Sequence, residues 1–321
     1  MPLLVEFPKW FTISVAVALG LSLGSFLNVV IYRVPRGMSL IKPASTCPGC
    51  QTPIRFYDNI PLFGYLLLRG RSRCCRTTIS PRYPFVEALG GLLAWAIVVT
   101  KLEALPSDTP VHVALGHFAL YLSLGLGLIA ASFIDLDHMY VPDSITLGGT
   151  LVGVASAWLR PEIDTTGSLL GAAIGFLMIW LPFDLLYRKL RGRTGMAMGD
   201  AKLVMLAGAW FGWPGSVFAL LAGSVQGTVA ALILFLAKGS IEEPEAVQEE
   251  RAAMQRAIDE SEGEERARLE AEFEKDPIAE EAEPGLLGAR LAFGPFLALA
   301  TLEYLFFGEA LMNELFFFPP S

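Results

Sequence analysis

The chain has little charge and few of the residues from which soluble enzymes build their centres. Only 17% of its 321 residues are charged, whereas an ordinary soluble domain carries about 25% charged residues. The three histidines are scattered, and His112 and His117 are too isolated to form a ligand set. These shortages exclude an ordinary soluble domain. They direct attention to what is abundant, since 53% of the residues are hydrophobic.

Long apolar runs recur along the chain, each near the roughly 20 residues that a membrane-spanning helix needs. The predicted spans are 11–33, 85–102, 113–134, 144–159, 167–187, 199–212, 214–237 and 290–312. Glycines within spans, expected at close helix contacts, are Gly90, Gly91, Gly148, Gly149, Gly171 and Gly175. No basic region precedes the first run and no small-residue cleavage site follows it, so we expect no removable signal peptide. The sequence predicts an all-α integral membrane protein with about eight transmembrane helices.

Lysine and arginine are concentrated in two loops. Nine basic residues lie from Arg33 to Arg82, and four more lie in 188–193. Segments 103–112 and 160–166 hold almost none. Because short cytoplasmic loops of membrane proteins are enriched in Lys and Arg, we expect both basic loops in the cytoplasm and the N-terminus outside.

The net charge of −8 comes from one acidic segment. Residues 241–285 contain 17 Asp or Glu and five Lys or Arg, a local balance of −12 that leaves +4 for the rest of the chain. The expected topology places this segment in a cytoplasmic loop, 238–289. Its composition is typical of a solvated, partly disordered linker, and Glu and Arg at helical spacing over 245–275 leave a polar helix or hairpin open.

Carboxylates cluster where two of the predicted spans meet the membrane edge. Asp135 ends a long apolar run. The polar residues that follow it are Asp137, His138 and Asp143. In the second cluster, Gly195 and Gly199 lead to Asp200 at the start of a span, where a helix N-terminus favours negative charge. Two spans separate Asp135 from Asp200, so both are expected at the same membrane face.

Two carboxyl groups at one membrane face are suited to hydrolysing a peptide bond without a metal. Neighbouring carboxyls share one proton, because both do not ionise cheaply together, so one activates water as a base and the other protonates the leaving nitrogen. Titratable groups at membrane depth are functional candidates by default. A proton-coupled transporter or channel would use the same groups and is the rival hypothesis, and interfacial or helix-capping acids are the structural alternative.

All four cysteines fall in one polar loop between the first two spans. Cys47 and Cys50 have the spacing with which two thiolates chelate one zinc ion. Cys74 and Cys75 would complete a tetrahedral site, although adjacent side chains tend to diverge. Three thiolates with another ligand, or free redox-active thiols, are the alternatives.

Four stretches of the chain occur in a specific order and spacing. They are Gly24–Arg33, Ile79–Glu87, Ile134–Asp143 and Gly195–Leu203. Together they resemble the bacterial type IV prepilin peptidases, which are leader peptidase/N-methyltransferases with the GxGD form of intramembrane aspartic protease motif. The resemblance covers nearly the whole chain apart from the acidic loop.

The resemblance implies cleavage of the short basic leader of prepilins and pseudopilins after a glycine, at the cytoplasmic face of the bacterial inner membrane. It also implies methylation of the new N-terminus with S-adenosylmethionine. By motif position, Asp135 and Asp200 are the catalytic pair. The residues expected to support them are Asp137, Asp143, Lys202 and Gly199. The expected partners are prepilin substrates and the lipid bilayer, with no nucleic acid, and a non-catalytic factor of pilus or secretion-system assembly is a further alternative.

The family's cysteine loop ends in a Cys-x-x-Cys pair shortly before the Ile-Ser-Pro motif. Counted back from Ile79, Cys75 occupies the second family position, Ser72 occupies the first, and Cys74 is out of register. The expected ligands of a structural zinc are Cys47, Cys50, Cys75 and Cys74. Gly70 matches a glycine associated with methyl transfer in the family.

The predicted organisation has four parts. They are a first transmembrane helix at 1–33, a cytoplasmic Cys-rich loop at 34–84 with the zinc and methyltransferase region, a transmembrane peptidase core at 85–237 and 290–321, and an acidic cytoplasmic loop at 238–289. Pili, type II secretion and natural competence all use similar leaders, so each is a candidate source of the substrate.

Overall fold

The computed structural model describes residues 3, 6–160, 162–187, 189, 196–239, 244–273 and 291–316. Within these residues every regular element is a helix, and extended residues meet only in three isolated bridges. The prediction of an all-α protein is confirmed.

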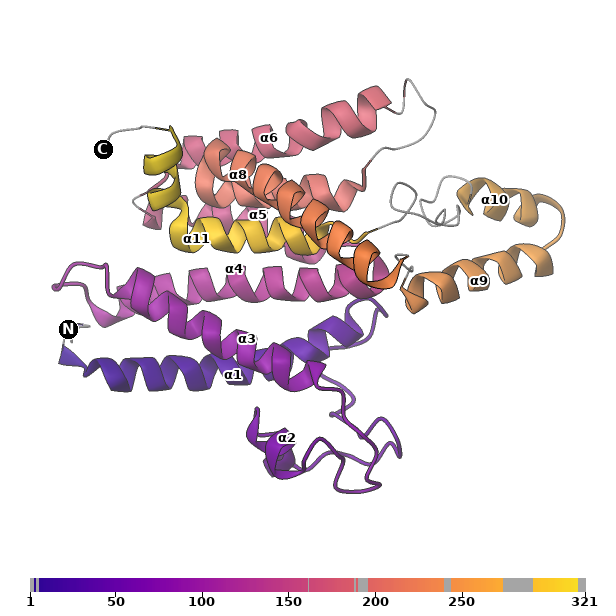
Figure 1. Cartoon of the computed structure of the whole chain (residues 1–321), viewed down its shortest axis with the longest axis horizontal. Coiled ribbons are helices and arrows are strands. Elements are labelled where there is room, and N and C mark those ends of the chain that lie inside the picture. Colours follow the sequence, from indigo (N-terminus) through magenta and orange to yellow (C-terminus); the bar gives the residue numbers. More distant parts are fainter. Residues whose placement is uncertain are drawn as a thin grey trace. The chain divides into compact units, whose positions relative to one another are not determined.

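The helices follow one another along the chain as labelled in Figure 1. They are α1 (Lys9–Arg33), α2 (Phe63–Leu67), α3 (Arg82–Ile97), α4 (Val111–His138), α5 (Asp143–Ala155), α6 (Thr165–Ile179), α8 (Met198–Lys238), α9 (Glu245–Glu260), α10 (Gly263–Phe273) and α11 (Gly294–Phe316). Short π-helical and 3-10 segments are Val98–Leu102 after α3, Trp180–Leu186 after α6, Phe56–Asn59 and Ala157–Leu159.

Five of the described helices are long and apolar enough to cross a membrane. They are α1, α3 and α6 with their π-helical extensions, α4, and α8. α11 adds a shorter apolar helix over Gly294–Gly308, and α5 has 13 residues. Helices satisfy their own backbone hydrogen bonds, as a hydrocarbon environment requires, so the chain is a multi-pass helical membrane protein.

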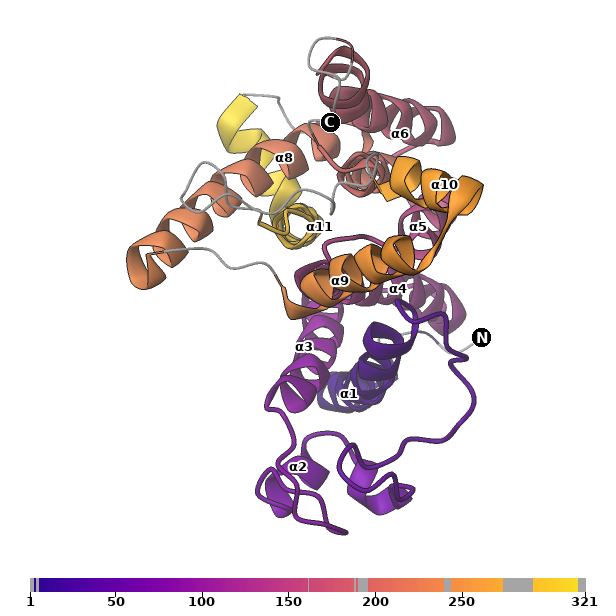
Figure 2. The same ribbon diagram turned by 90° about the vertical axis from the view of Figure 1, so that its right-hand side faces the viewer.

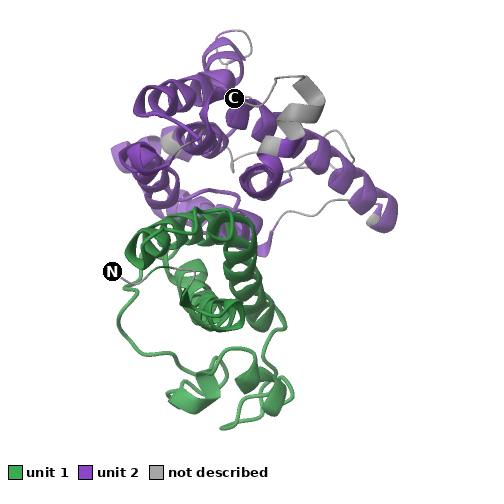
Figure 3. Cartoon of the chain, turned by 90° about the vertical axis from the view of Figure 1, so that its left-hand side faces the viewer, with its two compact units in different colours: residues 1–130 green, residues 131–321 purple. Residues whose placement is uncertain are grey.

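The chain divides into two compact units, 1–130 and 131–321, coloured separately in Figure 3. The boundary falls inside α4, so the membrane helices predicted as one peptidase core are distributed over both units. Asp135 and Asp200 belong to the second unit, and all four cysteines belong to the first.

In the first unit, α1 and α3 pack through glycines. A Cβ on Gly20 would lie 2.4 Å from the carbonyl oxygen of Gly90, so neither position has room for a side chain. Asn28 donates from Nδ2 to the carbonyl of Tyr83 at 3.1 Å, which ties α1 to the start of α3. Small residues of this kind let helix backbones approach closely in membranes, where apolar burial alone does not favour association.

In the second unit, α8 reverses direction at Gly212, whose φ of 71° and ψ of −173° are not helical. Ser216 Oγ lies 3.4 Å from the carbonyl oxygen of Val204. Residues twelve apart in a straight helix would be separated by about 18 Å. The two halves of α8 therefore fold back on each other, and they occupy the predicted spans 199–212 and 214–237.

The first half of α8 packs closely on α6. A Cβ on Gly208 would lie 2.1 Å from the carbonyl oxygen of Gly171, and a Cβ on Gly175 would lie 2.5 Å from that of Val204. The prediction of close packing is confirmed at Gly171 and Gly175. It is wrong for Gly148, around which an added Cβ meets nothing within 4 Å.

A buried arginine stabilises the turn of α8. Arg160 is 4% exposed, and its guanidinium donates to the carbonyls of Trp210 and Gly153. Its Cζ lies 4.8 Å from the centre of the Trp210 ring. The reversal at Gly212 takes carbonyls out of the helical hydrogen-bond ladder, and the cation satisfies two of them, those of Trp210 and Ala209.

The acidic loop contains two helices within its described part. α9 and α10 are joined by a short turn and diverge from it (Figure 2), with Val247 and Ile258 of α9 buried and the acidic side chains mostly exposed. The polar-helix alternative therefore holds for 245–273. Residues 240–243 and 274–290 lie outside the described part of the chain.

Candidate functional site

Asp135 lies on the last turn of α4, three residues before the helix ends at His138. Its side chain is buried, with 5% of the residue exposed. Met139 ends the helix with a φ of 53° and donates its N–H to the carbonyl of Asp135 at 2.8 Å. The sequence had predicted this position at the edge of an apolar span.

Asp200 lies in the first turn of α8 and is also buried, at 7% exposed. The preceding Gly199 contacts the loop after α4, because a Cβ there would lie 3.3 Å from Cβ of Val141. Gly195, the first glycine of the motif, lies outside the described residues.

A third segment completes this end of the second unit, and the sequence did not reveal it. Gly294, the first residue of α11, donates its N–H to Oδ2 of Asp135 at 2.8 Å. A Cβ on Gly294 would lie only 2.7 Å from the same oxygen and 3.2 Å from Cγ2 of Val141. The Gly-Pro step that opens the last apolar run was the available signal, since glycine permits such close approach.

The supporting residues occupy different places around the pair. Lys202 forms an ion pair with Asp143 at 2.5 Å, between Nζ and Oδ1, which joins the start of α8 to the start of α5. Asp137 is half-buried, two residues beyond Asp135 on the same helix. The ring of His138 lies 6.3 Å from the ring of Tyr140.

These contacts place two buried carboxyl groups at the ends of helices, one of them held by a backbone N–H at a helix N-terminus. A helix N-terminus favours a negatively charged carboxylate, and burial makes ionisation of both groups together costly. The arrangement suits a pair that holds one proton between them and exchanges it with a bound water or amide.

The four cysteines form a single cluster in the first unit. Their Sγ atoms all lie within 4.8 Å of one another. The shortest separations are 3.2 Å for Cys50–Cys74 and 3.5 Å for Cys47–Cys75. Hydrogen bonds from Ser72 and Thr77 lower the pKa of the Cys75 thiol to about 5. A thiolate is the form that binds metals, and these hydrogen bonds favour that form at Cys75.

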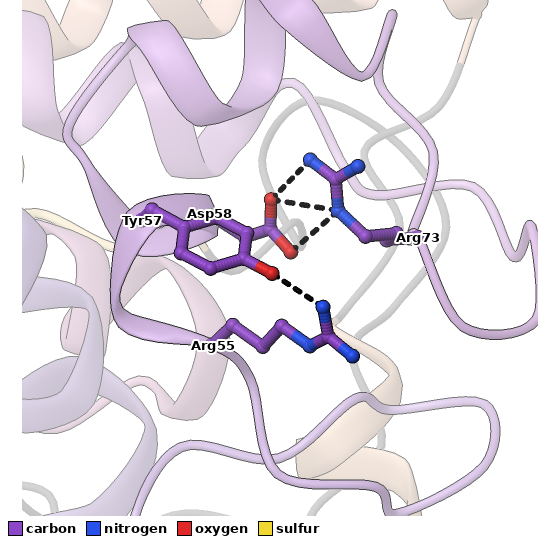
Figure 4. A network of polar contacts seen from close by, with 4 residues as sticks. All are labelled: Arg55, Tyr57, Asp58 and Arg73. Atoms are coloured by element: carbon purple, nitrogen blue, oxygen red, sulfur yellow. Dashed lines mark hydrogen bonds and ion pairs between the residues drawn. The ribbon is translucent and has the colours of Figure 1, made fainter.

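An ion pair holds the second half of the cluster in place (Figure 4). Arg73 Nε lies 3.0 and 2.9 Å from the two carboxylate oxygens of Asp58, and Nη2 lies 2.7 Å from Oδ1. Arg73 lies between Ser72 and Cys74 in the chain. Its bidentate ion pair with Asp58 therefore restrains the backbone on which these two residues lie. Arg55 and Tyr57 lie beside this ion pair, and Nη1 of Arg55 donates a hydrogen bond to the hydroxyl of Tyr57 at 2.5 Å.

Gly70 has a left-handed backbone, with φ of 69°, and a Cβ there would lie 3.0 Å from the hydroxyl of Tyr65. Its place in the loop is thus explained by conformation. The first unit also contains a cleft of about 350 Å³ between α1 and the start of the Cys-rich loop. Its lining includes Ser22, Ser25, Phe26, Arg33, Ala44 and Asn59.

The fold is that of a polytopic helical membrane protein, with two buried aspartates at helix ends. Residues 18–101 match the family model for the bacterial peptidase A24 N-terminal domain, and residues 122–232 match that for the type IV leader peptidase family. The chain belongs to the type IV leader peptidase family.

Its relatives include several prepilin leader peptidase/N-methyltransferases. That of Neisseria gonorrhoeae is 37% identical over 257 residues, covering 71% of this chain and 84% of the relative. Those of Myxococcus xanthus and Aeromonas hydrophila are 38% and 35% identical, covering 69% and 74% of this chain and 62% and 87% of the relatives. No solved structure matches the chain.

Proposed function

We propose that this protein is a membrane aspartic endopeptidase that removes the leader peptide of type IV prepilins and pseudopilins, with Asp135 and Asp200 as its catalytic pair. One observation carries the proposal: two buried carboxyls, 65 positions apart in sequence, lie at helix ends that meet around Val141, which both Gly199 and the Asp135-bound Gly294 approach. The names of the relatives supply the substrate class. Family membership favours this activity over proton-coupled transport, which would use the same acids.

The reaction follows from a pair that shares one proton. The ionised carboxyl removes a proton from water, whose oxygen attacks the scissile carbonyl carbon. The protonated partner gives its proton to the leaving nitrogen as the C–N bond breaks. One proton has entered the pair and one has left it, so the pair is ready for the next turnover. Gly294 holds Asp135 in place through its backbone N–H throughout.

Leader release tests the proposal. The full chain, purified in detergent, is mixed with a prepilin that carries a Gly-Phe junction before its hydrophobic segment, and the products are weighed by mass spectrometry. We expect a cut after the glycine. Asp259→Asn, on the acidic helix α9, should leave the rate unchanged and is the matched control for the same change at Asp135 or Asp200. An intact prepilin, or a cut at another bond, would contradict the proposal.

The proposed orientation places this site at the cytoplasmic face of the bacterial inner membrane. The basic loop from Arg33 to Arg82 supports it, because Lys and Arg concentrate in short cytoplasmic loops. Eight crossings result if α1, α3, α4, α5, α6, the two halves of α8 and α11 each cross the membrane once. With the basic loop in the cytoplasm, the N-terminus then lies outside. The proposed parts are then the span 1–33, the Cys-rich loop 34–84, the core 85–237 with 290–321, and the acidic loop 238–289.

The cysteine cluster is proposed to hold a structural zinc ion. Four sulfurs within 4.8 Å of one another fit a tetrahedral thiolate site. The ion would fix the fold of the loop and take no part in peptide cleavage. Metal analysis of the purified protein tests this, and a content below about one ion per four chains would contradict a site on which the loop's fold depends.

Methylation of the new N-terminus is the second proposed activity, supported by the N-methyltransferase names of the relatives. S-adenosylmethionine supplies the methyl group when bound. The cleft lined by Ser25 and Asn59 is its proposed place, because residues of the Cys-rich loop 34–84 form part of its wall. Ser25→Phe, which fills the cleft, is expected to reduce methyl transfer while leader release continues. Labelled S-adenosylmethionine measures the transfer, and unchanged methylation would exclude the cleft.

A further inference from the structure

The cysteine loop contains the same small structural motif twice. Isolated antiparallel bridges join Thr46 to Pro53 and Arg71 to Thr78, at a constant offset of 25 residues. Segment 46–53 contains Cys47 and Cys50. Segment 71–78 contains the other two cysteines, so the two motifs face one shared cluster of sulfur atoms.

The hydrogen bonds of the first motif define its turn. Cys47 donates its N–H to the carbonyl of Thr52 at 2.9 Å, and Gln51 donates to the carbonyl of Cys47 at 2.8 Å. Gln51 has a φ of 58°. Cys50 Sγ lies 3.3 Å from the hydroxyl of Thr52.

The second motif repeats each of these features 25 residues later. Ser72 donates its N–H to the carbonyl of Thr77 at 2.8 Å, and Arg76 donates to the carbonyl of Ser72 at 3.1 Å. Arg76 has a φ of 61°. Cys75 Sγ lies 3.0 Å from the hydroxyl of Thr77. The repeat therefore aligns Cys50 with Cys75, and it aligns Cys47 with a serine.

The second motif has Ser72 where the first has Cys47, and its second cysteine, Cys74, lies at a different position of the turn. Cys74 aligns with Gly49 of the first motif, where an added Cβ would lie 2.3 Å from the hydroxyl of Thr77. The first motif thus has no room for a side chain there. In the second motif the position carries a cysteine, and its Sγ lies 3.2 Å from that of Cys50.

Ser72 lies beside the sulfur atoms but is not needed as a metal ligand. It is 7% exposed, and its Oγ lies 3.3 Å from Cys75 Sγ. A neutral hydroxyl is a weaker zinc ligand than a thiolate, and it can donate a hydrogen bond to a metal-bound sulfur. With Zn–S bonds of about 2.3 Å, the sulfurs of a tetrahedral site lie about 3.8 Å apart. The observed 3.5 Å for Cys47–Cys75 and 4.0 Å for Cys74–Cys75 are close to this value.

We infer that Cys74 supplies the fourth thiolate of the metal site from outside the repeat, and that Ser72, at the repeat position, orients Cys75 by donating a hydrogen bond to its sulfur. This inference rests on the proposed zinc site and assigns its ligands. It predicts that the fourth thiolate ligand can come from position 72 or from position 74, and that one cysteine at either position is sufficient.

Metal binding by the full-length protein tests this exchange of positions. Zinc content, the zinc dissociation rate and the sulfur count from X-ray absorption at the zinc edge are measured for the wild type, Cys74→Ser and Ser72→Ala. We expect four sulfurs in the wild type and in Ser72→Ala, and three in Cys74→Ser. Cys74→Ser should release zinc at least about tenfold faster, since even the loss of an outer hydrogen-bonding partner costs ten- to a hundredfold in metal affinity.

The double variant Ser72→Cys/Cys74→Ser is the decisive control. It restores a regular repeat and should recover four sulfurs and release zinc more slowly than Cys74→Ser, because the ligand set is again four thiolates. Three sulfurs in the wild type together with an unchanged zinc dissociation rate in Cys74→Ser, or no rescue in the double variant, would overturn the inference while leaving a zinc site in place. A wild type without zinc, with Cys50 and Cys74 joined in a disulfide, would instead overturn the zinc proposal itself.

Discussion

Among single residues, the Asp58–Arg73 pair is the contact that fixes the second half of the cysteine cluster. Arg73 holds the pKa of Asp58 below its ordinary 3.8. A carboxyl with a lowered folded pKa stabilises the fold fully above the unfolded value, and this contribution is lost as the pH falls through the folded value. Because the Arg73 side chain is 53% exposed, the effect is modest.

Asp58→Asn should therefore loosen the loop at neutral pH. Hydrogen exchange of residues 71–78 should be faster than in the wild type at pH 7. The difference should disappear at pH values below the lowered pKa of Asp58, where the wild-type carboxyl is also neutral. Equal exchange at pH 7 would show that Arg73 does not position this segment.

Gly294 provides a second test at this scale. In Gly294→Ala the backbone N–H remains, but the added Cβ would meet Oδ2 of Asp135 at 2.7 Å and displace it. Leader release should fall about ten- to a hundredfold, as expected for a small misplacement of a reacting group. Gly148→Ala, with open space around the new atom, is the matched control. An unchanged rate in Gly294→Ala would mean that Asp135 is not held by α11.

The sequence predicted the positions of Asp135, Asp200 and the cysteines, because motif spacing and the membrane edge restrict them. It also placed Ser72 at the missing family position. Gly294 was not predicted, since its contact with Asp135 joins residues 159 positions apart and depends on the packing of α11. The sequence of an apolar run does not indicate which carboxylate the backbone N–H at its first residue will bind.

Among the helices, the crossing of α6 and the first half of α8 depends on paired glycines. A Cβ on Gly208 would lie 2.1 Å from the carbonyl of Gly171, so Gly208→Ala should force the helices apart. We expect a loss of about 1–3 kcal/mol, as for other overpacked contacts, measured as a lower thermal midpoint in detergent. Gly116→Ala in α4, where the space is open, should leave the midpoint unchanged or raise it, and equal midpoints for both variants would contradict this account.

Helix locations were largely predictable from apolar runs, whereas the contacts between helices were not. The glycine-tryptophan-proline step at 212–214 indicates a break, but the direction of the chain after the break depends on the φ of Gly212. Gly148 and Gly149 show the same limit. Successive residues of a helix point about 100° apart, so Gly149 meets Leu206 while its neighbour meets nothing.

For the whole molecule, the proposed orientation predicts which membrane face exposes the cysteine loop. Cys50 and Cys74 are exposed, so after chelation of the metal a membrane-impermeant maleimide should label them in inverted membrane vesicles and not in intact spheroplasts. Lysed spheroplasts control for reagent activity. Labelling of intact spheroplasts would reverse the topology and place the loop outside.

Asp135 and Asp200 are proposed to act as one unit in cleaving the leader peptide. The most direct measurement compares leader release by the wild type, Asp135→Asn, Asp200→Asn and the double variant, with retained folding shown by thermal unfolding. Residues that act as a unit are strongly non-additive, so each single variant should lose at least about a thousandfold and the double variant should lose no more. Cleavage by either single variant within about tenfold of the wild type would contradict the account, since a pair that shares one proton cannot work with one member.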